Sequence, residues 1–160
     1  MRPLALLLAL LLSTAYGAAH ADTLTGRATV IDGDTIELHG ERIRLLDIDA
    51  PESRQTCGDP PWRCGQMAAW WLAAYLEDEV VTCEISRRDR YARWLARCRF
   101  HANGHTVDLS ILMAGDGMAV PYRDCRCEDV RAAADEARAA GRGIHAGTYV
   151  EPWLWRKGER

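Results

Sequence analysis

Hydrophobic and polar residues alternate along two parts of the chain in a way that predicts short β-strands. In the N-terminal part the predicted strands cover residues 29–31, 35–38 and 42–46, separated by Asp-Gly-Asp and His-Gly-Glu turns. A second pair is predicted over residues 80–86 and 93–100, with Arg90 and Tyr91 at the centre of the connecting hairpin. The chain is therefore expected to contain five strands.

Apolar residues at helical spacing predict three helices between and after these strands. The first covers residues 66–77, and we expect it to bury Met67, Trp70, Trp71, Ala74 and Tyr75. The second covers residues 108–114 with Asp108 as its N-cap, and the third covers residues 127–140.

The order of these elements distinguishes between fold classes. A β-sandwich needs about seven strands and no helix in mid-chain. Five strands with a helix between the third and the fourth fit a small Greek-key barrel. We therefore predict an α+β fold, namely a five-stranded OB-type Greek-key β-barrel with three helices.

The first 21 residues have the pattern of a secretory signal peptide. Arg2 precedes an apolar run at residues 4–12, and the segment ends in Ala19-His20-Ala21. An uncleaved N-terminal anchor is the alternative. We expect a secreted or periplasmic protein in which residues 22–160 form a single domain, at about residues 24–147, with a short C-terminal tail.

Six cysteines in an exported chain indicate disulfides. Cys57 and Cys64 flank a turn-rich loop, while Cys83 and Cys98 lie at equal distances from the hairpin centre and would face each other. We therefore expect these two pairs. The state of Cys125 and Cys127 stays open, because a ring with one intervening residue is strained. A zinc site would need better-spaced Cys/His pairs and a reducing compartment.

The composition and charge of the chain exclude some ways of binding nucleic acid. The 160 residues are 48% hydrophobic and 27% charged, which suits a globular domain. With 20 basic against 23 acidic residues the net charge is −3, so bulk positive charge cannot hold a polyanion. Residues 87–99 nevertheless contain six arginines and one aspartate. We expect Arg93, Arg97 and Arg99 to form a local basic strip on one face of the hairpin.

Carboxylates gather in one short part of the sequence. Asp34 follows a glycine turn, and Asp49 and Glu52 flank the proline-stiffened bend at Pro51. Like charges this close raise one another's pKa unless a cation lies between them. A hard divalent ion with oxygen ligands would provide that charge.

The block from residue 30 to residue 52 resembles the staphylococcal nuclease (thermonuclease) family. That family carries a D-G-D-T turn followed by R-L-x-x-x-D-x-P-E, and both motifs are present here. The resemblance extends to residues 89–93 and 117–122, and covers about residues 24–147. Ala92 stands where the family usually has glycine, so a positive φ at this position would cost energy. Asp47 replaces an apolar residue and is expected to add negative charge near the metal site.

The resemblance implies a role for each matching residue. A calcium ion would be bound by the carboxylates of Asp34 and Asp49 and by the main-chain carbonyl of Ala50, with Asp32 in the outer shell. Glu52 would be the general base. The remaining roles are a phosphate clamp, formed by Arg44 and Arg93, and contacts to neighbouring phosphates and sugars, made by Arg90, Tyr91 and Tyr122.

These expectations describe a calcium-dependent nuclease that cleaves DNA and RNA and leaves 3′-phosphates. We expect a monomer whose partner is its nucleic acid substrate, with no stable membrane association after signal cleavage. One alternative is a catalytically silent OB module that binds single strands, which would have no need of Glu52. Another is a disulfide-stapled extracellular interaction domain, which would leave the carboxylate cluster unexplained.

Overall fold

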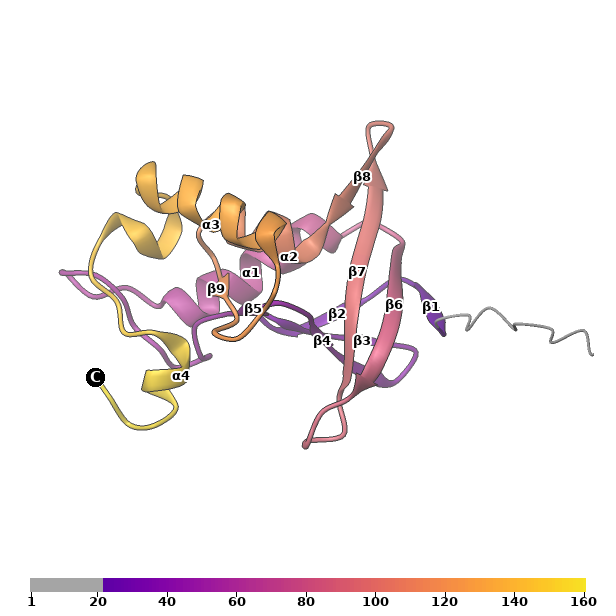
Figure 1. The fold of residues 1–160 in the computed structure, drawn as a ribbon, viewed down its shortest axis with the longest axis horizontal. Helices are drawn as coiled ribbons and strands as arrows, with labels where there is room; N and C mark the ends of the chain where they lie inside the picture. Colours follow the sequence, from indigo (N-terminus) through magenta and orange to yellow (C-terminus); the bar gives the residue numbers. More distant parts are fainter. Residues whose placement is uncertain (1–21) are drawn as a thin grey trace, which may run out of the picture.

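The computed structural model describes residues 22–160, so the expected signal peptide at residues 1–21 lies outside the described part. Nine strands and five helical segments follow one another within residues 22–160, and Figure 1 shows the helices gathered on one side of a curled sheet. The strands are β1 (Thr23–Gly26), β2 (Thr29–Asp32), β3 (Thr35–Leu38), β4 (Glu41–Leu45), β5 (Ile48–Asp49), β6 (Val81–Arg88), β7 (Trp94–Ala102), β8 (His105–Asp108) and β9 (Val120–Pro121). The helices are α1 (Cys64–Leu76), α2 (Leu109–Gly115), α3 (Glu128–Ala139), the 3₁₀ helix η1 (Gly143–Ala146) and α4 (Pro152–Trp155).

The main sheet has seven strands. Six of them lie in the order β1-β6-β7-β4-β3-β2, and β8 pairs with β7 beyond that path. All pairings are antiparallel except that between β4 and β7. The sheet curls into a half-barrel, and a hydrogen bond of 2.9 Å between His39 Nε2 and the Thr25 carbonyl joins the β3–β4 turn to β1.

The predicted α+β, OB-type architecture is therefore confirmed. The sheet is larger than the five expected strands, because β1 pairs with β6 and β8 pairs with β7. The short helix α4 adds to the three expected helices, and Asp108 caps α2 as predicted, accepting from the main-chain N–H groups of Ser110 and Ile111. Within the described residues, no helix has both the length and the apolar character needed to cross a membrane.

The prediction of which face α1 buries is wrong. The helix buries Cys64, Gly65, Ala68, Leu72 and Leu76, and the Trp70 side chain is 61% exposed. Small side chains on the buried face let the helix approach the barrel closely. The larger aromatic residues lie at its margin, where the Trp71 and Tyr75 side chains donate hydrogen bonds to Asp116 beyond the end of α2.

Buried apolar residues form two separate clusters. The larger one fills the half-barrel and the space between the sheet and helices α1, α2 and α3. The smaller one consists of Cys57, Cys64, Val120 and Ile144, against which Trp62, Tyr149 and Trp153 pack. This second cluster attaches the C-terminal part of the chain to the start of α1.

Candidate active site

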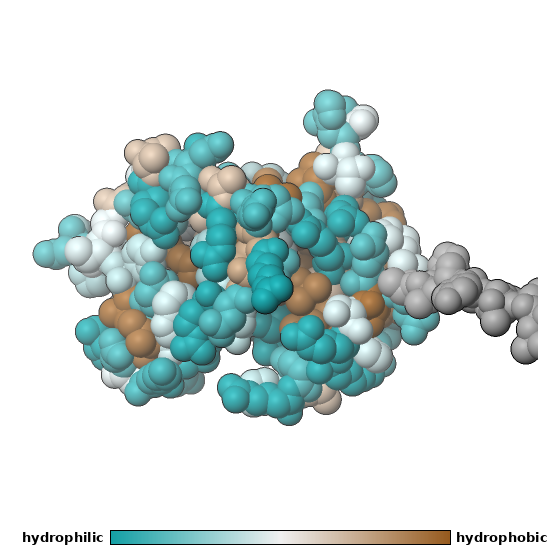
Figure 2. Space-filling model, in the orientation of Figure 1, coloured by the Kyte–Doolittle hydropathy of each residue, from teal (hydrophilic) through white to brown (hydrophobic). Residues whose placement is uncertain are grey.

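A cleft of about 1100 Å³ contains most of the residues that the sequence singled out. Its walls come from the β2–β3 turn with residues 44–53, from the tip of the β6–β7 hairpin, and from residues 122–126 together with Arg156. Hydrophilic residues dominate the face of the molecule that Figure 2 shows, and the hairpin tip projects from the sheet in Figure 1.

Two buried carboxylates share one arginine at the base of this cleft. Arg44 Nη1 lies 2.5 Å from Asp34 Oδ2, and its Nη2 lies 2.8 Å from Asp49 Oδ1. Asp49 is fully buried and Asp34 is 4% exposed. Gly33 makes the turn before Asp34 possible, because a Cβ atom there would come within 2.7 Å of the Ala50 Cβ. The Arg44 guanidinium thus fixes the spacing of both acids.

Burial and charge act against each other in this cluster. Burial raises the pKa of Asp34, the nearby charge of Arg44 opposes that rise, and Asp32 adds to it. Burial also disfavours the charged form of Arg44, but Asp34 and Asp49 outweigh it, so the pKa of Arg44 is raised. The charged forms of both side chains are therefore stabilised by the opposite charge beside them.

The donor set fits a divalent cation. Calcium prefers oxygen ligands. The two buried carboxylates and the Ala50 main-chain carbonyl provide them. A hydrogen bond of 3.1 Å from the Ala50 N–H to Asp34 Oδ2 holds this main chain beside Asp34. Asp32 lies behind them and accepts from the Asp34 N–H at 3.1 Å. Four carboxylates lie close together around two guanidinium groups at the base of the cleft. The carboxylates are those of Asp32, Asp34, Asp49 and Glu52, and the guanidinium groups are those of Arg44 and Arg156.

Glu52 has a fixed backbone and a half-exposed side chain. Its N–H donates to Gln55 Oε1 at 3.1 Å, and its carbonyl accepts from the Gln55 N–H at 2.7 Å. Gly65 at the start of α1 lies so close that any Cβ atom would overlap the Glu52 carbonyl oxygen. The Glu52 carboxylate therefore extends into the cleft from a rigid base, as a proton acceptor for chemistry there would require.

Arg93 is connected to the buried carboxylates through the hydroxyl group of Thr35. Its Nε and Nη2 lie 2.9 and 2.8 Å from Asp89 Oδ2, and its Nη1 donates to Thr35 Oγ1 at 3.3 Å. Thr35 in turn donates to Asp34 Oδ1 at 2.9 Å. Ala92, just before Arg93, has a φ of 62°, in the left-handed region that favours glycine.

Aromatic side chains stand at the rim of the cleft. Tyr91 is 66% exposed, with the guanidinium carbons of Arg90 and Arg93 at 5.0 and 5.5 Å from its ring centroid. Tyr122 is 42% exposed and belongs to another segment, held by a 2.7 Å hydrogen bond from its N–H to the Asp47 carbonyl. Both can contact a flexible chain that enters the cleft.

One sequence-based expectation about charge is wrong. Arg97 pairs with Asp108 and Asp129, and Arg99 pairs with Glu84 and Asp108, so no free basic strip runs along β7 in the described structure. Asp47, which was expected to add negative charge near the metal site, lines the same cleft. Burial raises the pKa of its carboxyl, the charge of Arg97 opposes that rise, and the charges of Asp129 and Asp108 add to it.

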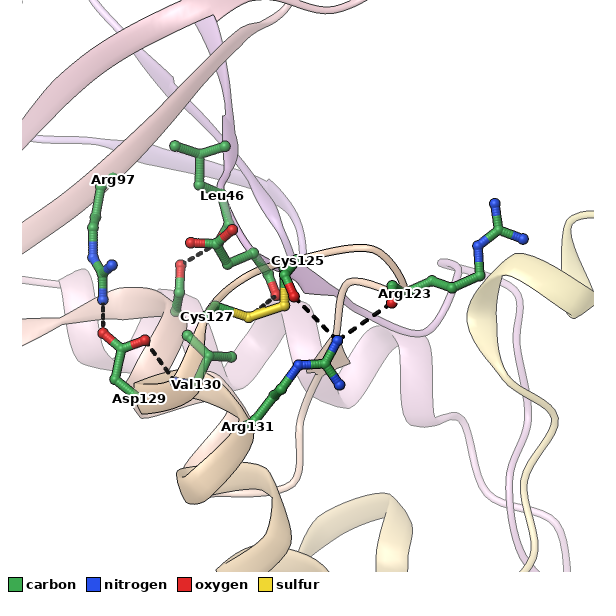
Figure 3. Close-up of a disulfide and its surroundings, with 10 residues drawn as sticks. Leu46, Arg97, Arg123, Cys125, Cys127, Asp129, Val130 and Arg131 are labelled. Carbon is green, nitrogen blue, oxygen red and sulfur yellow. Dashed lines mark hydrogen bonds and ion pairs between the residues drawn. A yellow bond between two sulfur atoms is a disulfide. The ribbon is translucent and has the colours of Figure 1, made fainter.

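The six cysteines form three pairs in the structure. Cys57 is bonded to Cys64 and Cys83 to Cys98, and Cys125 is bonded to Cys127. Figure 3 shows this third disulfide in the loop before α3, with Arg131 donating from that helix to the main-chain carbonyls of Arg123 and Cys125. The loop that carries Tyr122 is thus attached to α3.

The sequence analysis missed two residues that the structure places at the site. Thr35 belongs to the D-G-D-T motif, and its buried hydroxyl could have been expected to contact a neighbouring carboxylate. Arg156 lies in the C-terminal tail and contacts both Asp49 and Glu52. The sequence indicates Arg156 only indirectly. Several acids cluster near Asp34, and Arg44 alone cannot balance their negative charge, so a second positive group is needed there.

Comparison with known proteins agrees with this geometry. Residues 42–146 match the family described as staphylococcal nuclease homologue. The chain is 39% identical over 148 residues to the succinoglycan biosynthesis protein ExoI of Rhizobium meliloti (strain 1021), covering 89% of this chain and 75% of that protein. It is 34% identical to an uncharacterized endonuclease of Escherichia coli O157:H7 (79% and 80% covered) and 32% identical to a micrococcal nuclease of Shigella flexneri (82% and 79% covered). Because the match includes more than half of the chain and most of each relative, this protein belongs to the staphylococcal nuclease family.

Proposed function

We propose that this protein is a secreted or periplasmic nuclease that hydrolyses phosphodiester bonds of DNA and RNA and depends on calcium. Nuclease activity is supported by membership of the family and by relatives named as nucleases. The observation that carries the proposal is the pairing of Arg44 with two buried aspartates in a cleft that Glu52 and Arg93 also line.

The proposed roles follow from position. Asp34, Asp49 and the Ala50 carbonyl would hold the cation, which when bound supplies Lewis-acid stabilisation of the phosphoryl oxygens. Arg44 and Arg93 donate charge-assisted hydrogen bonds to the scissile phosphate as negative charge builds up on it. Glu52 accepts a proton from the attacking water. Arg90, Tyr91 and Tyr122 bind the neighbouring phosphate and sugar groups.

We further propose which phosphodiester bond is broken, the oligomeric state of the protein and where it acts. Attack on phosphorus breaks the bond to the 5′ oxygen, so the products carry 3′-phosphates. Removal of residues 1–21 would leave a monomer that has no stable attachment to a membrane and acts on nucleic acid outside the cytoplasm. Residues 22–160 would form its single domain, and the disulfides suit an oxidising compartment.

A degradation assay tests the proposal. Purified residues 22–160 are incubated with plasmid DNA and with RNA in calcium, in magnesium, and in calcium followed by excess chelator. We expect cleavage of both substrates in calcium, its loss on chelation, and 3′-phosphate ends in end-group analysis. Full activity in chelator would contradict the calcium dependence. Binding of single strands with no cleavage under any condition would favour the silent OB module instead.

A further inference from the structure

The C-terminal segment returns to the cleft and places a guanidinium group on its carboxylates. Arg156 Nη2 lies 2.7 Å from Asp49 Oδ2, and Arg156 Nη1 lies 3.0 Å from Asp49 Oδ1 and 2.5 Å from Glu52 Oε1. The Arg156 side chain is 39% exposed, whereas that of Asp49 is fully buried. Arg156 is the one residue that contacts an expected cation ligand and the expected general base together in the described structure.

The segment before Arg156 is anchored along its length. Gly58 N–H donates to the Thr148 carbonyl at 2.7 Å, and the fully buried Gln55 donates to the Val150 carbonyl at 2.6 Å. Trp153 packs on the small apolar cluster that contains the Cys57–Cys64 pair. The same Gln55 accepts from the Glu52 N–H, so one side chain connects the expected base to the tail.

Both carboxylate oxygens of Asp49 accept hydrogen bonds from arginine in this arrangement. Its Oδ1 accepts from Arg44 and Arg156, and its Oδ2 accepts from Arg156. A calcium ion must approach a carboxylate oxygen to about 2.3–2.6 Å, and its positive charge repels a guanidinium group held on the same carboxylate. An arginine that holds both oxygens with its planar fork therefore competes directly with the cation for Asp49.

We propose that Arg156 is a built-in counter-ion of the cation site, which occupies Asp49 and Glu52 when the cation is absent and must leave Asp49 when the cation binds. The tail thereby sets the cation affinity. It also keeps Glu52 paired until the cation arrives, which couples the availability of the base to the loading of the site. This inference rests on the proposed function, because it takes Asp34, Asp49 and Ala50 as the cation site.

Calorimetric titration of calcium into the metal-free protein, without substrate, tests the competition. The variants are Arg156→Gln and the matched control Arg160→Gln, which removes the same charge from the same tail. Arg160 stacks on Trp155 and donates to main-chain carbonyls, away from the cleft acids. We expect Arg156→Gln to bind calcium more tightly by about 5- to 150-fold, a usual range for coupling between two sites. Arg160→Gln should match the wild type.

Other outcomes separate the inference from the proposed function. Equal or weaker calcium binding by Arg156→Gln would overturn the competition and leave the calcium site standing. Equal tightening by Arg160→Gln would show a general charge effect and would overturn it as well. If no variant binds calcium, both proposals fail. Arg156→Lys keeps the charge but not the two-pronged contact, so its affinity should fall between those of the wild type and Arg156→Gln, which tests the contact even if Arg156→Gln folds poorly.

Discussion

Two walls of the cleft, the carboxylate wall around Asp34 and Asp49 and the hairpin wall at the tip of β6 and β7, are built in different ways. The carboxylate wall is buried and joins three elements of the fold, because Arg44 from β4 pairs with acids from the β2–β3 turn and from β5. The hairpin wall is exposed and local, because Asp89 alone accepts hydrogen bonds from the N–H groups of Tyr91 and Arg93 and from the Arg93 side chain. Groups that must meet a small ion are placed rigidly, whereas groups that meet a long flexible substrate sit on an adaptable tip.

The largest expected effect is on the carboxylate wall, at Glu52. Glu52→Gln keeps the shape and removes the base, so turnover should fall about 10²–10⁴-fold while binding of an oligonucleotide persists. Single-turnover cleavage and a binding titration on one substrate measure both. Glu41→Gln is the control, because it removes the same negative charge from a carboxylate that pairs with Arg88 and does not belong to the buried acid cluster. Equal cleavage by Glu52→Gln and the wild type would refute the assignment.

On the hairpin wall, Arg93 is expected to matter more than its neighbour Arg88. Arg93→Ala should lower turnover by about 10²–10³-fold, because it removes a donor whose contact strengthens in the transition state. Arg88 pairs with Glu41 and its guanidinium carbon lies 3.9 Å from the Trp94 ring centroid, so Arg88→Ala should mainly change the salt dependence of binding. Cleavage and binding at several salt concentrations would distinguish them, and identical profiles would show that the tip acts through charge alone.

Loss of either disulfide should lower the free energy of unfolding, but only one of the two losses should change calcium binding. Loss of Cys57–Cys64 or Cys83–Cys98 by paired substitution to serine should each cost about 2–3 kcal/mol, from loops closed across 7 and 15 residues. The first change should also free the tail and tighten calcium binding, whereas the second should leave calcium binding alone. Denaturant unfolding and calorimetry measure both effects, and peptide mapping without reductant checks the pairs. A similar calcium response in both variants would contradict this expectation.

The smallest effect is the pH dependence of the hairpin tip. Burial acts to raise the pKa of Asp89, but hydrogen bonds from the main chain and side chain of Arg93 and from the Tyr91 N–H hold it below its usual value. A lowered folded-state pKa contributes stability that is complete above the unfolded value of about 3.9 and is lost as the pH falls. Asp89→Asn should therefore cost more stability at pH 6 than at pH 3. Denaturant unfolding at both values tests the sign, and a cost that grows on acidification would contradict it.

Local signals in the sequence were sufficient for much of the fold. The turn residues Gly33 and Gly40, the N-cap Asp108 and the cysteines placed symmetrically about Arg90 each act over a few residues, and the corresponding elements were predicted. The buried face of α1 was misplaced because hydrophobicity favours tryptophan inside, while close packing against the barrel favours alanine and glycine.

Charge partners were harder to predict, because they depend on tertiary structure. The two acids that neutralise Arg97 come from the end of β8 and from α3, and neither has a fixed spacing from β7 in the sequence. Arg156 is 107 residues from Asp49 and lies in a tail with no recognised motif. The family signature, in contrast, gave candidate roles to Asp34, Arg44 and Asp49, because all three lie within its two short motifs.

The separation of the buried residues into two clusters has a consequence for how the molecule opens. A cluster of four buried side chains protects its backbone far less than the main core does, so it should open by itself, as a cooperative unit smaller than the whole domain. Amide hydrogens of residues 144–156 would then exchange with solvent well before those of β6 and β7. Each such opening would loosen the segment that carries Arg156 while the barrel itself stays folded.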